Sequence, residues 1–71
     1  MKIEFSKEAD AIYISFHEEP VERSKEIEDG VVADFNADRR LIGIEVLDVS
    51  QRYETSDISS IQIENILREA V

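Results

Sequence analysis

Hydrophobic and polar residues alternate along the first two thirds of the chain with a period of two, which is typical of half-buried β-strands. Ile3 and Phe5 fall on one face of a first expected strand. After a polar turn at residues 6–10, the apolar positions of residues 12–16 share one face of a second strand. The short turn predicts that the two strands pair as an antiparallel hairpin.

A charged third strand is expected at residues 21–28. Pro20 precedes it and interrupts the pairing, because proline has no backbone N–H to donate to a sheet. Charged residues occupy both faces of this segment, a pattern that is typical of an edge strand protected against aggregation. Asp29 and Gly30 follow, and they predict a two-residue type I′ turn, since both residues tolerate positive φ.

Two more strands complete the expected sheet, at residues 31–35 and 40–46, with a turn at residues 36–39 between them. The last strand is apolar on both faces, which indicates a position inside the sheet or under a helix. Its Gly43 is expected to permit close packing against an aromatic residue such as Tyr13.

The apolar period changes after residue 46. Residues 47–53 predict a short helical turn, and residues 54–56 a polar link. We expect a final helix capped by Ser59 or Ser60. Its apolar positions have the spacing of one helix face: Ile63, Ile66, Leu67 and Ala70.

These elements predict one small α+β domain over residues 1–71, with a curled antiparallel β-meander of about five strands in residues 1–47. Residues 48–71 then supply a short turn and a C-terminal helix packed on one face of the sheet. The opposite face retains an apolar patch, drawn from Tyr13, Val31, Ala33 and Phe35. Because the core is small and this patch is left over, we expect a homo-oligomer, with a dimer favoured.

The charge of the chain narrows its possible partners. Asp and Glu number 17 and Lys and Arg 8, which gives a net charge of −9. The cations are scattered, so neither nucleic acid nor an anionic membrane surface is an expected partner. The sequence has no cysteine, no apolar run of membrane-spanning length and no apolar signal segment, and we therefore expect a cytoplasmic protein.

The acidic residues concentrate between positions 18 and 29, a segment that contains six acidic and two basic residues. Such a segment is either a solvated edge strand that charge keeps soluble or a docking surface for a basic protein. The candidate partner-binding residues are Glu22, Glu26, Glu28 and Asp29.

A weaker candidate is a divalent-metal site. Asp34, Asn36 and Asp38, with Glu45 further on, fall at the spacing of a calcium-binding loop. Arg39 stands where such a loop needs glycine, so a polar hairpin turn is the competing interpretation. No phosphate loop, dinucleotide motif or His/Cys ligand spacing occurs, so no cofactor is expected.

Two stretches resemble a known family. Residues 5–14 and residues 30–48, which include the run Leu41-Ile42-Gly43-Ile44-Glu45, resemble the small prokaryotic domain-of-unknown-function family 2283. Phe5 and Ser6 replace the Tyr-Asp pair of the family pattern, and Arg39 replaces its usual glycine. The resemblance implies no catalytic residues, and it suggests an antitoxin-like role because some members are paired with small toxin-like proteins.

Three hypotheses follow. The first is a non-enzymatic interaction module that binds a basic partner protein through the acidic edge at residues 21–29. The second is a small carboxylate-dependent enzyme or metal binder that uses Glu45, Asp34 and Asp38. The third is a purely homo-oligomeric structural protein.

Overall fold

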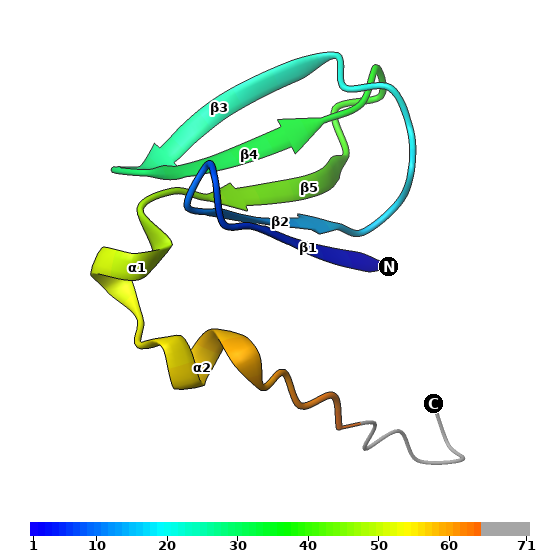
Figure 1. The fold of residues 1–71 in the computed structure, drawn as a ribbon. Coiled ribbons are helices and arrows are strands. Elements are labelled where there is room, and N and C mark those ends of the chain that lie inside the picture. Colours follow the sequence, from blue (N-terminus) through cyan, green and yellow to red (C-terminus); the bar gives the residue numbers. More distant parts are fainter. Residues whose placement is uncertain (65–71) are drawn as a thin grey trace.

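The computed structural model of the protein describes residues 1–64 (Figure 1). These residues form a five-stranded antiparallel sheet followed by two short helices, which confirms the predicted α+β meander. The strands and helices are β1 (Lys2–Ser6), β2 (Ala11–Ser15), β3 (Arg23–Glu28), β4 (Val31–Phe35), β5 (Leu41–Val46), α1 (Val49–Arg52) and α2 (Thr55–Ser59).

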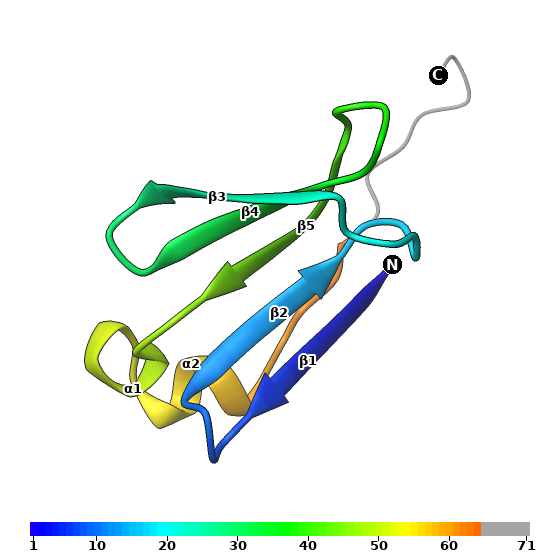
Figure 2. The same ribbon diagram turned by 90° about the horizontal axis from the view of Figure 1, so that it is seen from above.

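The strands lie in the order β1-β2-β5-β4-β3. The hairpin β1–β2 and the meander β3–β4–β5 are joined where β2 pairs antiparallel with β5. This order confirms that β3 is an edge strand and that the apolar strand β5 lies at the centre of the sheet (Figure 2).

The pairing register gives the sheet two faces of different character. Ile12 and Val31 both pair with Val46, so the apolar positions of β2, β4 and β5 point the same way. We call this side the apolar face: Ile3, Phe5, Ile12, Ile14, Val31, Ala33, Phe35, Ile44 and Val46. At the β3 edge, Arg23, Lys25 and Glu28 lie on the same side, because they pair with Phe35, Ala33 and Val31. The side chains at the alternate positions form the opposite face.

The expected apolar patch is therefore placed wrongly. Val31, Ala33 and Phe35 share the apolar face with Ile12, whereas Tyr13 lies on the opposite side of the sheet. The sequence predicted correctly which residues alternate within each strand. Which residues of β2 and β4 point to the same side of the sheet depends on β5, because β5 lies between these two strands. The sheet has one apolar face instead of an apolar patch on each side.

The helix α1 closes one end of the sheet. Val49 is fully buried, with an exposure of 0%. The backbone N–H of Ser50 and its hydroxyl donate hydrogen bonds of 2.9 and 2.7 Å to the carboxylate of Asp10 in the β1–β2 turn. The guanidinium of Arg52 donates to the backbone oxygen of Asp29 in the β3–β4 turn. The predicted helical turn at residues 47–53 is thus confirmed. Its hydrogen bonds connect the β1–β2 turn with the β3–β4 turn.

The β3–β4 turn differs from the predicted type. Glu28 pairs with Val31, as a two-residue connection requires, but only Gly30 has a positive φ, of 77°. A type I′ turn needs positive φ at both central residues, so the expectation for Asp29 is wrong. The ladder instead shifts register between Glu26 and Glu28, so Glu26 pairs with Val32 and Glu28 with Val31. One extra residue on β3 is typical of a β-bulge.

The C-terminal helix also differs from expectation. Helix α2 ends at Ser59, where the predicted helix begins, and Ser60 is its C-terminal cap. The residues expected to form a polar link start this helix instead, because Glu54 and Asp57 form a reciprocal capping box. Ile63 lies beyond the helix, and Ile66, Leu67 and Ala70 lie outside the described residues.

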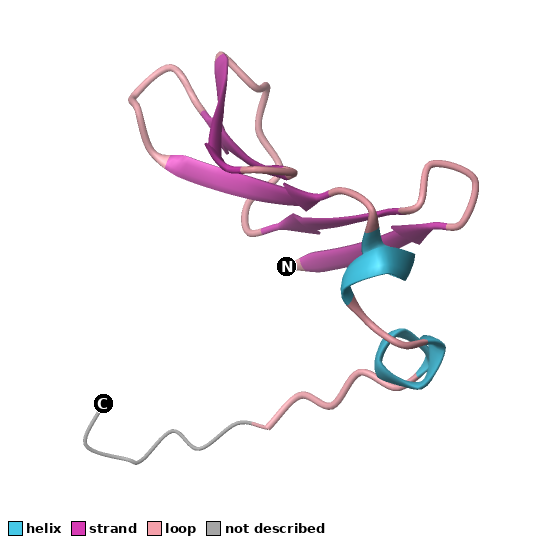
Figure 3. Ribbon diagram, turned by 90° about the vertical axis from the view of Figure 1, so that its left-hand side faces the viewer, coloured by secondary structure: helices cyan, strands magenta, loops and turns pink. Residues whose placement is uncertain are grey.

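Helix α2 stands away from the sheet on the side of its apolar face (Figure 3). None of its residues is buried. A groove of about 1010 Å³ separates it from β1, with Phe5, Tyr53 and Ile58 among its lining residues. Among the described residues, helix α2 therefore leaves the apolar face uncovered.

Candidate interaction surface

The edge strand β3 presents its whole length to solvent. All six of its residues are exposed, and it pairs on one side only, with β4. The outward-facing backbone groups of an edge strand can accept an additional strand from another chain. Strand β3 therefore has one side of its backbone along which no other strand of residues 1–64 pairs.

The four predicted partner-binding residues are distributed along this edge. Glu22 lies just before β3, and its backbone N–H donates a 2.8 Å hydrogen bond to the Phe35 carbonyl. Glu26 and Glu28 belong to the strand, and Asp29 lies in the turn that follows. At about 3.3 Å per residue, the carboxylates extend over roughly 20 Å, so they line an edge and do not converge on one ion.

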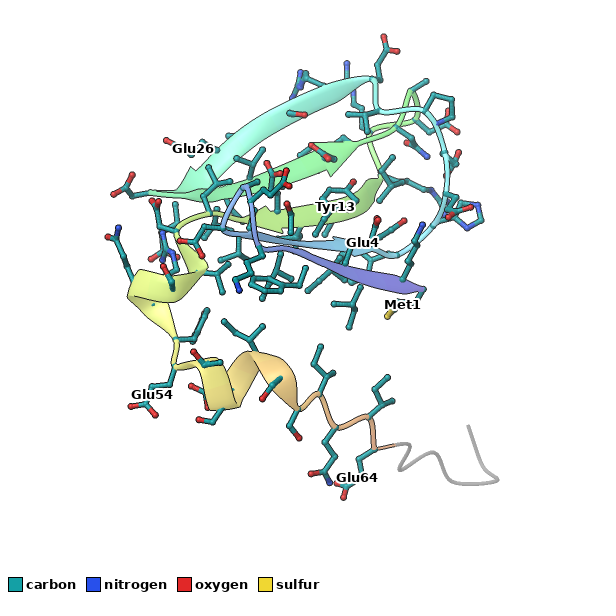
Figure 4. The ribbon with its side chains drawn as sticks, viewed as in Figure 1. Met1, Glu4, Tyr13, Glu26, Glu54 and Glu64 are labelled. Atoms are coloured by element: carbon teal, nitrogen blue, oxygen red, sulfur yellow. The ribbon has the colours of Figure 1, made fainter. Side chains whose placement is uncertain are left out.

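The register unites Glu26 with carboxylates from three other strands. Glu26 of β3 pairs with Val32 of β4, and Val32 pairs with Glu45 of β5. Glu45 pairs with Tyr13 of β2, and Tyr13 pairs with Glu4 of β1. We call this side of the sheet the acidic face: Glu4, Tyr13, Glu26, Asp34 and Glu45. Glu4, Tyr13 and Glu26 are labelled in Figure 4. Lys2 is the cation that shares it, and its ammonium lies 3.8 Å from Glu4.

Tyr13 lies at the centre of the acidic face. Its hydroxyl donates a 2.9 Å hydrogen bond to Asp34, whose other carboxylate oxygen accepts from the Ser24 hydroxyl. Its ring lies over Gly43, where an added Cβ would come within 2.7 Å of Cζ. The expected packing of Gly43 against Tyr13 is thus confirmed.

The ionisation of Tyr13 reflects these surroundings. Burial raises its pKa above the ordinary value of 10.0, and the hydrogen bond to Asp34 raises it further. The negative charges of Asp34, Glu45 and Glu4 act in the same direction. The raised pKa of Tyr13 therefore reflects, in part, the negative electrostatic potential of carboxylates on three other strands.

The structure does not bring the candidate metal ligands together around one point. Asp34 accepts hydrogen bonds from Tyr13 and Ser24 on the acidic face. The side-chain oxygen of Asn36 accepts two 2.9 Å bonds, from the backbone N–H groups of Asp38 and Arg40, and so holds its own turn. Within residues 1–64, no three His, Cys, Asp or Glu side chains are grouped so that they could hold a metal ion.

Sequence reasoning missed that Glu4, Asp34 and Glu45 belong to the same surface as Glu26. The sequence did predict which residues of each strand point to the same side as one another. The missing information was the strand order, because residues from β1, β3, β4 and β5 can only be assigned to one face once β2 is known to pair with β5.

The arrangement defines a small open-sheet module with an apolar face, an acidic face and a free edge. The chain belongs to the family described as a protein of unknown function, DUF2283, whose model matches residues 2–50. The match covers the sheet and ends in α1, so α2 lies beyond it. No curated protein and no solved structure matched the chain. Neither helix of residues 1–64 has the length and apolar character needed to cross a membrane.

Proposed function

We propose that the protein is a small cytoplasmic interaction module that binds a basic partner protein, in the manner of an antitoxin. The observation that carries the proposal is the coincidence of a free edge strand with carboxylates along it and on the adjoining acidic face. Backbone pairing with β3 would provide affinity, and the carboxylates would select a positively charged strand.

Electrostatics supports this assignment. The chain carries a net charge of −9, and carboxylates of four strands share one side of the sheet with the phenol of Tyr13. A surface with one sign of charge accelerates the association of an oppositely charged partner and repels like-charged proteins. The effect weakens with added salt, because the Debye length falls to about 8 Å at physiological ionic strength.

The negative edge has a defined extent. At its Glu22 end, a hollow of about 340 Å³ is also lined by Arg23 and Arg39, so the charge there is mixed. The Glu26 end adjoins the acidic face, because Glu26 pairs with Val32 and so lies level with Glu45. We therefore expect the partner's cations to contact Glu26 and Glu28 more closely than Glu22.

The test uses a strand-forming peptide of alternating Lys and Val and a matched peptide of alternating Glu and Val. The cationic peptide should shift the backbone NMR resonances of β3, bind more weakly as salt rises, and lose binding when Glu22, Glu26 and Glu28 are all replaced by Lys. A control variant changes net charge equally by reversing exposed acids outside residues 18–29: Glu8, Asp38 and Glu64.

Purification of the tagged protein from its native cells at low salt tests the partner itself. A basic protein should be recovered with the wild-type chain and with the control variant, but not with the edge variant. Equal recovery or equal peptide binding by the two variants would show that net charge alone is responsible, and would remove the edge from the proposal.

A further inference from the structure

The apolar face is larger than a monomer of this size ordinarily leaves uncovered. The hydrophobic residues buried among residues 1–64 are Ala11, Ala33, Ile42 and Val49. Ile3 and Phe5 are 39% and 45% exposed. The remaining strand positions of this face are only partly buried, apart from Ala33. Within residues 1–64, the sheet thus has no second layer packed on this face, and a stable domain requires one.

The dimensions of the molecule show the same deficit. The radius of gyration of its Cα atoms is 14.0 Å, whereas a compact domain of this length has about 11 Å. The accessible surface is 6108 Å², whereas a monomer of this mass exposes about 4,500 Å². The excess of roughly 1,600 Å² is shared between the open apolar face and helix α2, none of whose residues is buried; about half of it equals the area of about 800 Å² that one partner buries in a standard protein interface.

We propose that a second copy of this chain supplies the missing layer, by packing its apolar face against the same face of the first. The dimer would be an aligned β-sandwich with its sheets about 10 Å apart. A two-fold symmetric interface needs a self-complementary surface, and a broad apolar sheet face satisfies that requirement.

Charge selects this surface over the others. Two chains of charge −9 repel each other, so they associate best through a surface that keeps their carboxylates apart. Face-to-face packing turns Glu4, Glu26, Asp34 and Glu45 outward on both copies. Contact through the acidic face would bring these carboxylates together, and contact through the β3 edge would bring together Glu22, Glu26 and Glu28 of the two copies. The dimer therefore leaves Glu26 and the unpaired backbone side of β3 free, whereas Glu28 lies on the same side of the sheet as Val31 and the apolar face.

Sedimentation equilibrium of the full chain between 1 and 100 μM, at about 0.05, 0.15 and 0.5 M NaCl, tests the proposal. The expected mass is twice 8.2 kDa. Added salt should strengthen the dimer, because it screens the repulsion between two acidic chains. A mass of 8.2 kDa at all concentrations and salts would overturn the proposal, whether the chain's own residues 65–71 or a foreign protein covers the face.

Substitutions locate the interface. Phe5→Glu places a charge on the apolar face and should weaken dimerisation about tenfold or more. Ser15→Glu adds the same charge on the opposite side of the sheet, opposite Lys2, and should leave dimerisation within about twofold of wild type. Equal weakening by both would overturn the assignment. Far-UV circular dichroism establishes that each variant is folded.

A second measurement does not depend on weakening the dimer. Because the chain has no cysteine, Ile44→Cys and Glu45→Cys place single thiols on opposite faces of the same central strand. A bismaleimide that spans about 10 Å, the distance between packed sheets, should link two Ile44→Cys chains and not two Glu45→Cys chains. Equal linkage would overturn the proposal. The binding of the Lys-Val peptide is measured separately. The dimerisation proposal can therefore be refuted while the proposal of partner binding at the β3 edge stands, and the reverse is also possible.

Discussion

Replacing Gly43 by alanine tests whether Tyr13 is fixed by the backbone beneath its ring. The φ of Gly43 lies outside the left-handed region, so alanine fits the backbone conformation itself. The new Cβ would overlap the phenol, with Cζ at 2.7 Å, and would approach the Ile14 carbonyl oxygen at 3.2 Å. The aromatic ring must therefore move, and its hydrogen bond to Asp34 is lost.

The magnitude follows from two opposing effects. A hydrogen bond to a charged acceptor contributes about 1.5–3 kcal/mol. Alanine is favoured over glycine in a strand by about 0.5–1 kcal/mol, which offsets part of the loss. Gly43→Ala should thus lower the free energy of unfolding by about 1–2 kcal/mol, which corresponds to a fall in Tm of roughly 6–12 °C for a domain of this size.

Urea unfolding, followed by circular dichroism at one protein concentration, measures the effect and avoids shifts caused by self-association. The control is the same substitution in a Tyr13→Val background, where no ring lies above residue 43. There Gly43→Ala should be neutral or stabilising, so the coupling energy should be at least about 1 kcal/mol. The same loss in both backgrounds would refute a role for the Tyr13 contact.

Three further results are expected. With the second tyrosine changed to phenylalanine, absorbance titration should place the Tyr13 pKa above 10.0, and Asp34→Asn should lower it. Because folding raises this pKa, the protonated phenol contributes stability below the unfolded value, and that stability is lost as pH rises through the folded pKa. Gly30→Ala should cost about 1–2 kcal/mol in urea unfolding, since its φ is 77° and the position faces a guanidinium; a neutral result would contradict the described turn. Val49→Ala should cost about 2 kcal/mol, whereas Val21→Ala at a 49% exposed site should be nearly neutral; equal costs would argue against the buried position of α1.

Much of the sheet could be predicted because its signals are local. The alternation in residues 12–16 and the apolar character of β5 are properties of single segments, and both elements were placed correctly. Pro20 and the charges of residues 21–28 likewise identified an edge. The side of the sheet to which the residues of different strands point was harder to predict. Tyr13 and Val31 were assigned to one side, since nothing local states that β5 lies between their strands.

The end of the chain shows how competing local signals misled the prediction. Ser59 and Ser60 have good capping side chains, and apolar residues follow them. Glu54 and Asp57 form a capping box five residues earlier, and that box starts α2 before the serines can start a helix. The acidic edge was found from composition, but its continuation across the sheet depended on pairings between distant strands.

The central position of β5 has a consequence for how the chain acquires its structure. As the chain is synthesised from its N-terminus, β1–β2 and β3–β4 are complete before β5 is available to either. A two-stranded hairpin is at best marginally stable in water. The sheet can form only when the last strand inserts between β2 and β4, which makes its completion a late and cooperative step. A chain interrupted before residue 41 would retain the sequences of two hairpins and lack the strand that joins them.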